Sequence, residues 1–209
     1  MKRFLIYTYI LISSVIITAI GYDYFLKQGH VKDAVSLGTE GASVLGAAKI
    51  SVFKDKNVPL YERPVRMMIE SLGMDVPVIE VGVEEDGTME APKDWFDAGW
   101  YRNSAHAGEP GNMVIAGHYD TSSGSPAAFW QLKSIKKDDT VVVFDKLDRS
   151  YTYRVTDIIY IDINDPNKLK IFESNKDKSS ITLITCSGVW LSGDLTYSKR
   201  LVVKGELIS

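Results

Sequence analysis

The segment SITLITC, residues 180–186, carries the clearest structural signal in the chain. Its first six residues are rich in β-branched side chains, which pack well on a pleated strand. A glycine-containing stretch follows the cysteine directly. We therefore expect a strand that ends at Cys186 and opens onto a loop. A side chain at such a position is both rigidly held and accessible, as a nucleophile must be.

Similar runs recur along the chain and predict further strands. They are VPVIEVGV (76–83), NMVIAGH (112–118), TVVVF (140–144), SYTYRVTDIIYI (150–161) and KRLVVKGELI (199–208). Clusters of Gly, Asp and Pro separate several of them. Helical signal is limited to two short segments, 126–132 and 165–174, in which Pro126 and Pro166 suit a first helical position. Many short strands at regular spacing predict an all-β barrel or sandwich.

Composition excludes several classes of protein. The chain has 209 residues, of which 45% are hydrophobic, and a formal net charge of −3. This apolar fraction supports a packed core and argues against disorder. The single cysteine excludes an intrachain disulfide and a cysteine-rich metal site. A net negative charge gives no basic surface for nucleic acid.

An uncharged run, residues 4–22, follows Lys2 and Arg3. As a helix it spans about 28 Å, close to the hydrocarbon thickness of a bilayer. A cleaved signal peptide would have a shorter apolar core and small residues at its end, whereas Asp23 and Tyr24 follow here. We therefore favour an uncleaved signal anchor over a signal peptide. The two cations predict a cytoplasmic N-terminus and an extracellular remainder, in a single-pass protein of the cell membrane.

The chain thus divides into three predicted parts. Residues 1–27 form the cytoplasmic tip and the transmembrane anchor. Residues 28–60 form a stalk or linker, because the glycines between 28 and 46 disfavour a stable helix. His30 lies in this stalk, where nothing orients it. Residues 61–209 form the β-domain.

Two further side chains occupy strand ends comparable to that of Cys186. His118 ends the run 112–118, and Arg200 starts the last run, fourteen residues after the cysteine. A nearby cation lowers the pKa of a thiol and stabilises the nucleophilic thiolate. An imidazolium can protonate a leaving amine, and a guanidinium can hold an oxyanion. The three residues suffice for acyl transfer from a peptide bond, although spacing alone does not show that they meet.

The same segments resemble a known family. TLITC (182–186) is similar to the TLxTC signature of sortases, and GNMVIAGH (111–118) and SKRLVV (198–203) resemble the sortase strands that bear the histidine and the arginine. The resemblance covers about 76–208 and includes the N-terminal anchor. It implies a closed eight-stranded β-barrel with one or two short helices. By resemblance, Cys186 is the nucleophile, His118 the general acid/base, and Arg200 the stabiliser of substrate and oxyanion.

The resemblance also implies a reaction. A surface protein with a C-terminal LPxTG-like sorting signal is cleaved after its threonine through a thioester. The acyl group then passes to an amine of a peptidoglycan precursor or a protein lysine in a Gram-positive cell wall, without a cofactor. The loop after His118 is similar to class D, E or F members. The absence of a DPW or DPF lid motif, and of a C-terminal membrane segment, argues against a pilus-building enzyme.

Several other residues are weaker candidates. Asp120 either orients His118, binds substrate or forms a turn. Thr185 is expected to point to the face opposite Cys186, so that only its backbone shapes the site. Trp190, in the loop after the cysteine, either packs on a substrate leucine or proline or anchors that loop. His106 lies in a polar loop and is a poor candidate.

An acidic group at 84–86 superficially resembles a calcium cluster. Consecutive side chains alternate in direction along a strand, however, and the Asp-Gly pair that ends the group is a hairpin signal. We therefore predict a turn here and no metal.

Two other functions remain open. One is a different anchored cysteine acyl-transfer enzyme. An L,D-transpeptidase would show its cysteine in an S-x-G-C-x-R-like motif, and a papain-like protease would place it on a helix. The other is a non-catalytic β-domain that binds a surface partner and buries Cys186. Thiol reactivity separates this second alternative from an enzyme.

Overall fold

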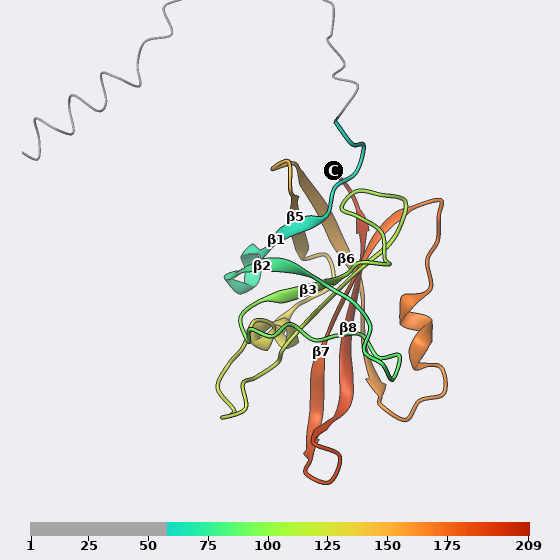
Figure 1. Ribbon diagram of the computed structural model, residues 1–209. Coiled ribbons are helices and arrows are strands. Elements are labelled where there is room, and N and C mark those ends of the chain that lie inside the picture. Colours follow the sequence, from blue (N-terminus) through green and yellow to red (C-terminus); the bar gives the residue numbers. More distant parts are fainter. Residues whose placement is uncertain (1–57) are drawn as a thin grey trace, which may run out of the picture. The chain divides into compact units, whose positions relative to one another are not determined.

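A computed structural model of the chain describes residues 58–209. Eight strands close into one barrel in the order β1-β2-β3-β4-β7-β8-β6-β5 (Figure 1). The closed eight-stranded all-β barrel is thereby confirmed. The strands are β1 (Pro64–Ile69), β2 (Met74–Val81), β3 (Ala98–Tyr101), β4 (Gly111–Gly117), β5 (Thr140–Asp145), β6 (Ser150–Asp162), β7 (Ser179–Leu191) and β8 (Thr196–Leu207).

Two of these strands, β1 and β3, have no counterpart among the predicted runs. β3 has only four residues and contains Gly99, a residue type that strands disfavour. The glycine is required because a Cβ there would lie 2.8 Å from a methyl group of Val81 on β2. Pairing within the barrel, rather than intrinsic propensity, therefore makes this segment a strand.

The two predicted helices are 3₁₀ turns in the structure. They are η2 (Trp130–Ser134) and η3 (Lys168–Phe172), and a third turn, η1 (Glu70–Leu72), joins β1 to β2. Residues 58–209 contain no α-helix, so the expected short helices are corrected to 3₁₀ turns. Pro126 and Pro166 precede these turns instead of starting helices. Segments this short form one tight turn because they have no long apolar face to bury.

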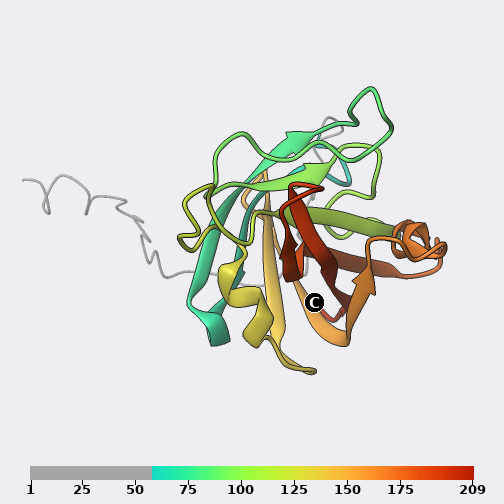
Figure 2. The same cartoon turned by 90° about the horizontal axis from the view of Figure 1, so that it is seen from below.

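The barrel interior is filled from alternate positions of the central strands. From β4, β7 and β8 the inward residues are Met113, Ile115, Ile181, Leu183, Leu201 and Val203. The residues between them face outward, and Val114, Ile184 and Val202 form a second buried cluster with Ile171 of η3. Figure 2 shows the β6–β7 connection with η3, in orange, lying to one side of the barrel. These strands are buried on both faces, which explains their continuously apolar sequences.

The predicted anchor (4–22) and residues 28–57 of the predicted stalk lie outside the described residues. Within 58–209, no helix is long and apolar enough to cross a membrane. The boundaries proposed for the three parts of the chain therefore stay predictions.

Candidate active site

Cys186 and Arg200 lie directly opposite each other on the antiparallel strands β7 and β8. Opposed residues in such a pair project from the same face of the sheet. Two residues further along, the pair Ile184 and Val202 belongs to the outer cluster. Cys186 and Arg200 therefore project from the outer face of the barrel, side by side, as the fourteen-residue spacing predicted.

His118 follows the end of β4, which runs parallel to β7. The last paired residues are Ala116 and Ile184, and the Thr185 hydroxyl donates a hydrogen bond to the Gly117 carbonyl at 2.8 Å. The two strands are thus still adjacent at Gly117 and Thr185, the residues directly before His118 and Cys186. The three candidate residues consequently reach the same end of the same face, although His118 and Cys186 are far apart in sequence.

The strand that carries Cys186 does not end there, in contrast to the expectation. β7 continues to Leu191 and forms a hairpin with β8, with a register shift between Ser187 and Trp190. Gly188 lies in this irregularity with φ of 88°, a value that favours glycine. Trp190 is therefore not a loop residue. It lies on β7 opposite Tyr197, with 51% of its surface exposed.

The imidazole of His118 is held by groups that the sequence did not identify. Its Nε2 lies 2.8 Å from the Pro92 carbonyl oxygen, and its ring packs against Trp95 with centroids 4.5 Å apart. A carbonyl oxygen only accepts, so Nε2 is the donor in this bond. Among residues 58–209, no hydrogen bond joins His118 to Asp120 or to Cys186. Pro92 and Trp95, rather than Asp120, orient the histidine.

Asp120 bonds to a different partner. Its carboxylate accepts a hydrogen bond from the hydroxyl of Tyr197 on β8. This bond, together with burial and the charge of the carboxylate, raises the pKa of Tyr197 to about 12. Nothing in the sequence distinguished Tyr197 from the other tyrosines. The pair joins the loop after β4 to the β7–β8 hairpin.

The electrostatic environment of Cys186 differs from the expected one. Burial raises the pKa of the thiol, Arg200 lowers it and the charge of Asp120 raises it, and the net shift is upward. The sequence argument predicted a cation that lowers this pKa. Arg200 does act in that sense, but desolvation outweighs it.

The Arg200 guanidinium folds back along the hairpin. Nη1 donates to the backbone oxygens of Tyr197 and Lys199 at 3.0 Å each, and Nη2 donates to the Thr196 hydroxyl at 3.0 Å. The tip of the hairpin therefore holds the side chain in place.

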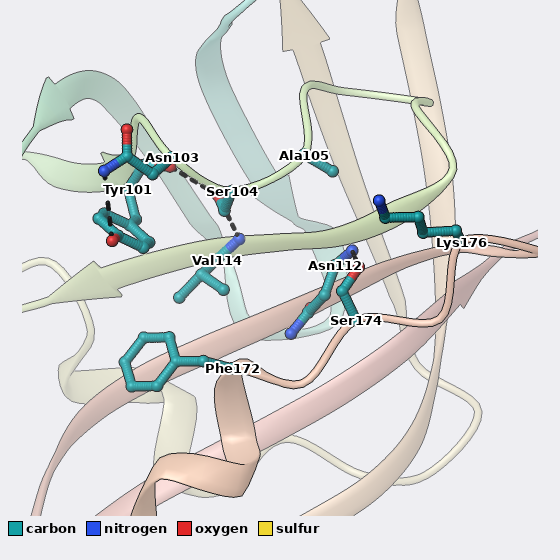
Figure 3. Close-up of a pocket in the computed structure, with 9 residues that line it drawn as sticks. All are labelled: Tyr101, Asn103, Ser104, Ala105, Asn112, Val114, Phe172, Ser174 and Lys176. Carbon is teal, nitrogen blue, oxygen red and sulfur yellow. Dashed lines mark hydrogen bonds between the residues drawn. The ribbon is translucent and has the colours of Figure 1, made fainter.

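Beyond Cys186 and Arg200, the outer face of the barrel is covered by the η3 segment. There Val114, Ile184 and Val202 are buried together with Ile171, and Phe172 packs against this cluster. Figure 3 shows a pocket further along the same strand β4, between Phe172 and the loop after β3. The pocket has a volume of about 230 Å³ and is lined by Tyr101, Asn103, Ser104, Ala105, Asn112, Val114, Phe172, Ser174 and Lys176.

Asn112 fastens the η3 segment to the barrel. Its side chain is almost fully buried and donates to the carbonyls of Ile171 and Glu173 at 3.0 and 3.2 Å. Its carboxamide oxygen accepts from the Thr182 hydroxyl at 2.8 Å. The η3 segment is thus tied to β4 and β7 through one residue.

Comparison with known proteins identifies the family. The family model described as a sortase domain matches residues 67–208. The chain belongs to the sortase family. No curated protein sequence matches it.

Solved structures support the same fold for this sortase. A Clostridium perfringens sortase D5 transpeptidase is 22% identical, with a TM-score of 0.52 over 71% of this chain and 79% of that one. A lid mutant of Corynebacterium diphtheriae sortase A is 23% identical, with a TM-score of 0.54 over 71% and 72%. Listeria monocytogenes sortase A is 24% identical, with a TM-score of 0.53 over 71% and 88%. These similarities do not select one class.

The remaining candidate site residues of this sortase bond to neighbouring groups of the barrel and its loops. The side chain of Thr185 is buried and bonds to Gly117, on the face opposite Cys186, as expected. His106 bonds through Nδ1 to Glu109 at 2.8 Å. Asp86 accepts hydrogen bonds from both the amide and the hydroxyl of Thr88 within a turn. Within the described part of the chain, no group of three or more His, Cys, Asp or Glu side chains is placed to hold a metal ion.

Proposed function

We propose that this sortase cleaves an LPxTG-like sorting signal through a thioester on Cys186 and transfers the acyl group to an amine. The observation that carries the proposal is the register of β7 and β8, which sets Cys186 beside Arg200. The parallel pairing of β4 with β7 supports a place for His118 at the same end. Family membership supports a cysteine transpeptidase in general, and the residue roles are our inference.

In the first step, the Cys186 thiolate attacks the threonine carbonyl carbon of the sorting signal. The carbonyl π electrons move to oxygen, and the guanidinium of Arg200 stabilises the resulting oxyanion. Collapse of this intermediate breaks the C–N bond. The departing amine takes a proton from the His118 imidazolium, and the acyl group remains on sulfur as a thioester.

In the second step, an acceptor amine attacks the thioester carbon. Its proton passes to neutral His118, the C–S bond breaks and the Cys186 thiolate is regenerated. One amide is thereby exchanged for another, with no net consumption of protons or electrons. Because burial raises the pKa of the Cys186 thiol, less of the attacking thiolate is present at neutral pH than for an exposed thiol.

The leucine and proline of an LPxTG-like motif need an apolar surface beside Cys186. The exposed ring of Trp190 lies four residues beyond Cys186, where it suits packing on the same peptide. We assign only a backbone role to Thr185.

The partners and location follow from the N-terminal sequence. The apolar run 4–22 after two cations supports a membrane anchor with an extracellular barrel. There the enzyme meets surface proteins that carry a sorting signal, and amines of peptidoglycan precursors or protein lysines. We place it among class D, E or F sortases because of the loop after His118.

A transfer assay tests this function. The full chain in detergent is incubated with an LPxTG-like peptide and an amine such as triglycine, and products are followed by mass spectrometry. We expect cleavage after threonine and a new amide with the amine, both lost in Cys186→Ala and His118→Ala variants that keep the wild-type circular dichroism spectrum. Full activity of Cys186→Ala would exclude the thioester route. An unreactive thiol together with no cleavage would favour a non-catalytic binding domain.

A further inference from the structure

The hydrogen bond between Tyr197 and Asp120 connects the two segments that flank Cys186. Asp120 lies in the connection between β4 and η2, and Tyr197 lies 77 residues later near the start of β8. This is a contact between the loop that follows His118 and the hairpin that carries Arg200.

Tyr197 is also a direct partner of Arg200. Its backbone oxygen accepts a hydrogen bond from Arg200 Nη1 at 3.0 Å, and the neighbouring Thr196 hydroxyl accepts one from Nη2 at 3.0 Å. The residue whose hydroxyl is held by Asp120 is therefore the residue whose carbonyl holds the guanidinium. Loss of the bond between the Tyr197 hydroxyl and Asp120 can therefore shift the Tyr197 carbonyl that holds Arg200.

Aromatic neighbours fix the direction of the Tyr197 ring. It makes edge contacts with Tyr119 (centroids 5.7 Å apart) and Trp190 (5.3 Å), and Tyr119 in turn stacks on Trp130 at 4.5 Å. On the other side, Asp120 is held by a β-bridge to Pro126. Both partners of the hydrogen bond are thus anchored by their own surroundings.

We propose that Tyr197 and Asp120 form a latch that positions Arg200 beside Cys186. Both are positioning residues, which act on the reaction through the guanidinium and through the charge of the carboxylate. The effect on turnover rests on the proposed function, whereas the effect on the thiol does not.

The latch has consequences for ionisation of Cys186. The groups whose charges act on the thiol are Arg200 of β8 and Asp120 of the loop after β4, and Tyr197 of β8 interacts with it electrostatically as well. The parallel pairing of β4 with β7 brings His118 to the same end of the barrel. Arg200 favours the thiolate, and Asp120 opposes it. The Tyr197 hydroxyl donates to the carboxylate and so reduces the negative charge that the thiol experiences.

Two substitutions therefore shift the thiol in opposite directions. Tyr197→Phe leaves the Asp120 charge without its donor and loosens the support of Arg200, and both changes disfavour the thiolate. Asp120→Asn removes the charge but keeps an oxygen that accepts from Tyr197, so the thiolate is favoured. A merely structural role would move both variants in the same direction, or neither.

The experiment measures alkylation of the full chain by iodoacetamide as a function of pH. The chain has one cysteine, so the signal reports Cys186 alone. We expect the midpoint to rise by about half a pH unit in Tyr197→Phe and to fall by a similar amount in Asp120→Asn. Tyr119→Phe is the matched control, because its hydroxyl bonds to Lys133 and not to Asp120.

Equal midpoints in Tyr197→Phe and Tyr119→Phe, or shifts of one sign in Tyr197→Phe and Asp120→Asn, would overturn the latch. If Tyr197→Phe does not fold, Asp120→Asn decides alone, and a midpoint at or above that of the wild type contradicts the proposal. In the transfer assay we expect kcat of Tyr197→Phe to fall about tenfold with little change in KM. Alkylation needs no peptide, so failure of the wild type to cleave a sorting signal would remove the proposed function and leave the latch to be judged separately.

Discussion

Cys186 and Arg200 face each other across the β7–β8 pair, on the outer surface of a barrel whose interior is filled from the alternate residues of the same strands. The pairing register fixes the separation of the Cys186 and Arg200 backbones through hydrogen bonds. The relative position of these two backbone segments is therefore as rigid as the sheet itself. What remains adjustable is the direction of the guanidinium, which the hairpin tip controls through Thr196 and Tyr197.

Replacement of Arg200 by lysine tests the role of the planar guanidinium. A lysine keeps the charge but loses the fork of donors, so we expect kcat/KM to fall by about 10²–10³-fold. Lys199→Ala is the control, since it removes a neighbouring cation that points to the other face of the strand. Steady-state peptide cleavage measures both. Wild-type kinetics in Arg200→Lys would remove Arg200 from the site.

The pH dependence of the thiol has a defined sign. Burial raises the pKa of Cys186 despite Arg200, so less thiolate is present at neutral pH than in an unfolded peptide. The alkylation rate at each pH is divided by its high-pH plateau, which corrects for accessibility. The pH at which the rate reaches half of that plateau should be higher than for an unstructured cysteine peptide. Arg200→Ala should raise the midpoint further. A wild-type midpoint below that of the peptide contradicts this description of the site.

The same shift predicts a stability effect at alkaline pH. A group whose folded pKa is raised stabilises the fold fully below its unfolded pKa, and this contribution is lost as the pH rises through the folded pKa. The wild type should therefore lose stability relative to Cys186→Ala as the pH is raised from neutral through the folded pKa. Urea denaturation at a series of pH values measures the difference. A difference that is independent of pH across this window is the opposing result.

Gly117 allows the close approach that places His118. A Cβ at this position would lie 2.6 Å from the Phe129 ring, which is fully buried. Gly117→Ala should destabilise the fold by about 1–3 kcal/mol, and it should lower activity by displacing the end of β4. Gly193→Ala is the matched control, since no atom lies within 4 Å of the added methyl group. Equal denaturation midpoints for the two variants would argue against a close contact at Gly117.

Asn112 should control the position of the η3 segment. Asn112→Ala leaves the buried carbonyl of Ile171 without its donor, which costs about 1–3 kcal/mol, and it also removes the partly buried bond to the Glu173 carbonyl. Because the η3 segment is loosened, we expect KM for the sorting peptide to rise more than kcat falls. Asn103→Ala, at the exposed end of the same pocket, should change neither. An unchanged KM in a folded Asn112→Ala variant speaks against this role.

The sequence predicted the parts of the site that depend on local pattern. Long β-branched runs gave β4, β7 and β8, and the position of His118 directly after β4 followed from its run. Cys186 and Arg200 were expected at strand ends, but they lie inside β7, which continues to Leu191, and β8, which begins at Thr196. β3 was missed because its four residues include a glycine that only the neighbouring strand explains. The extension of β7 beyond Cys186 was missed because pairing with β8 outweighs the glycine signal at residue 188.

Other features arise only from tertiary contacts. Pro92 and Trp95 support His118 from a segment more than twenty residues earlier, and Tyr197 reaches Asp120 across 77 residues. The raised pKa of Cys186 depends on how deeply the folded chain buries the thiol. None of these has a signature in a single sequence, since each is set by which loops the barrel brings together.

The most direct test of the central claim is the intact mass of the full chain after brief acidic quenching of a reaction with an LPxTG-like peptide and no added amine. We predict an adduct equal to the acyl part of the peptide, located on Cys186 and released by hydroxylamine, and absent from Cys186→Ala. Cleavage of the peptide after threonine without any such adduct, or with an adduct on another residue, would contradict the account.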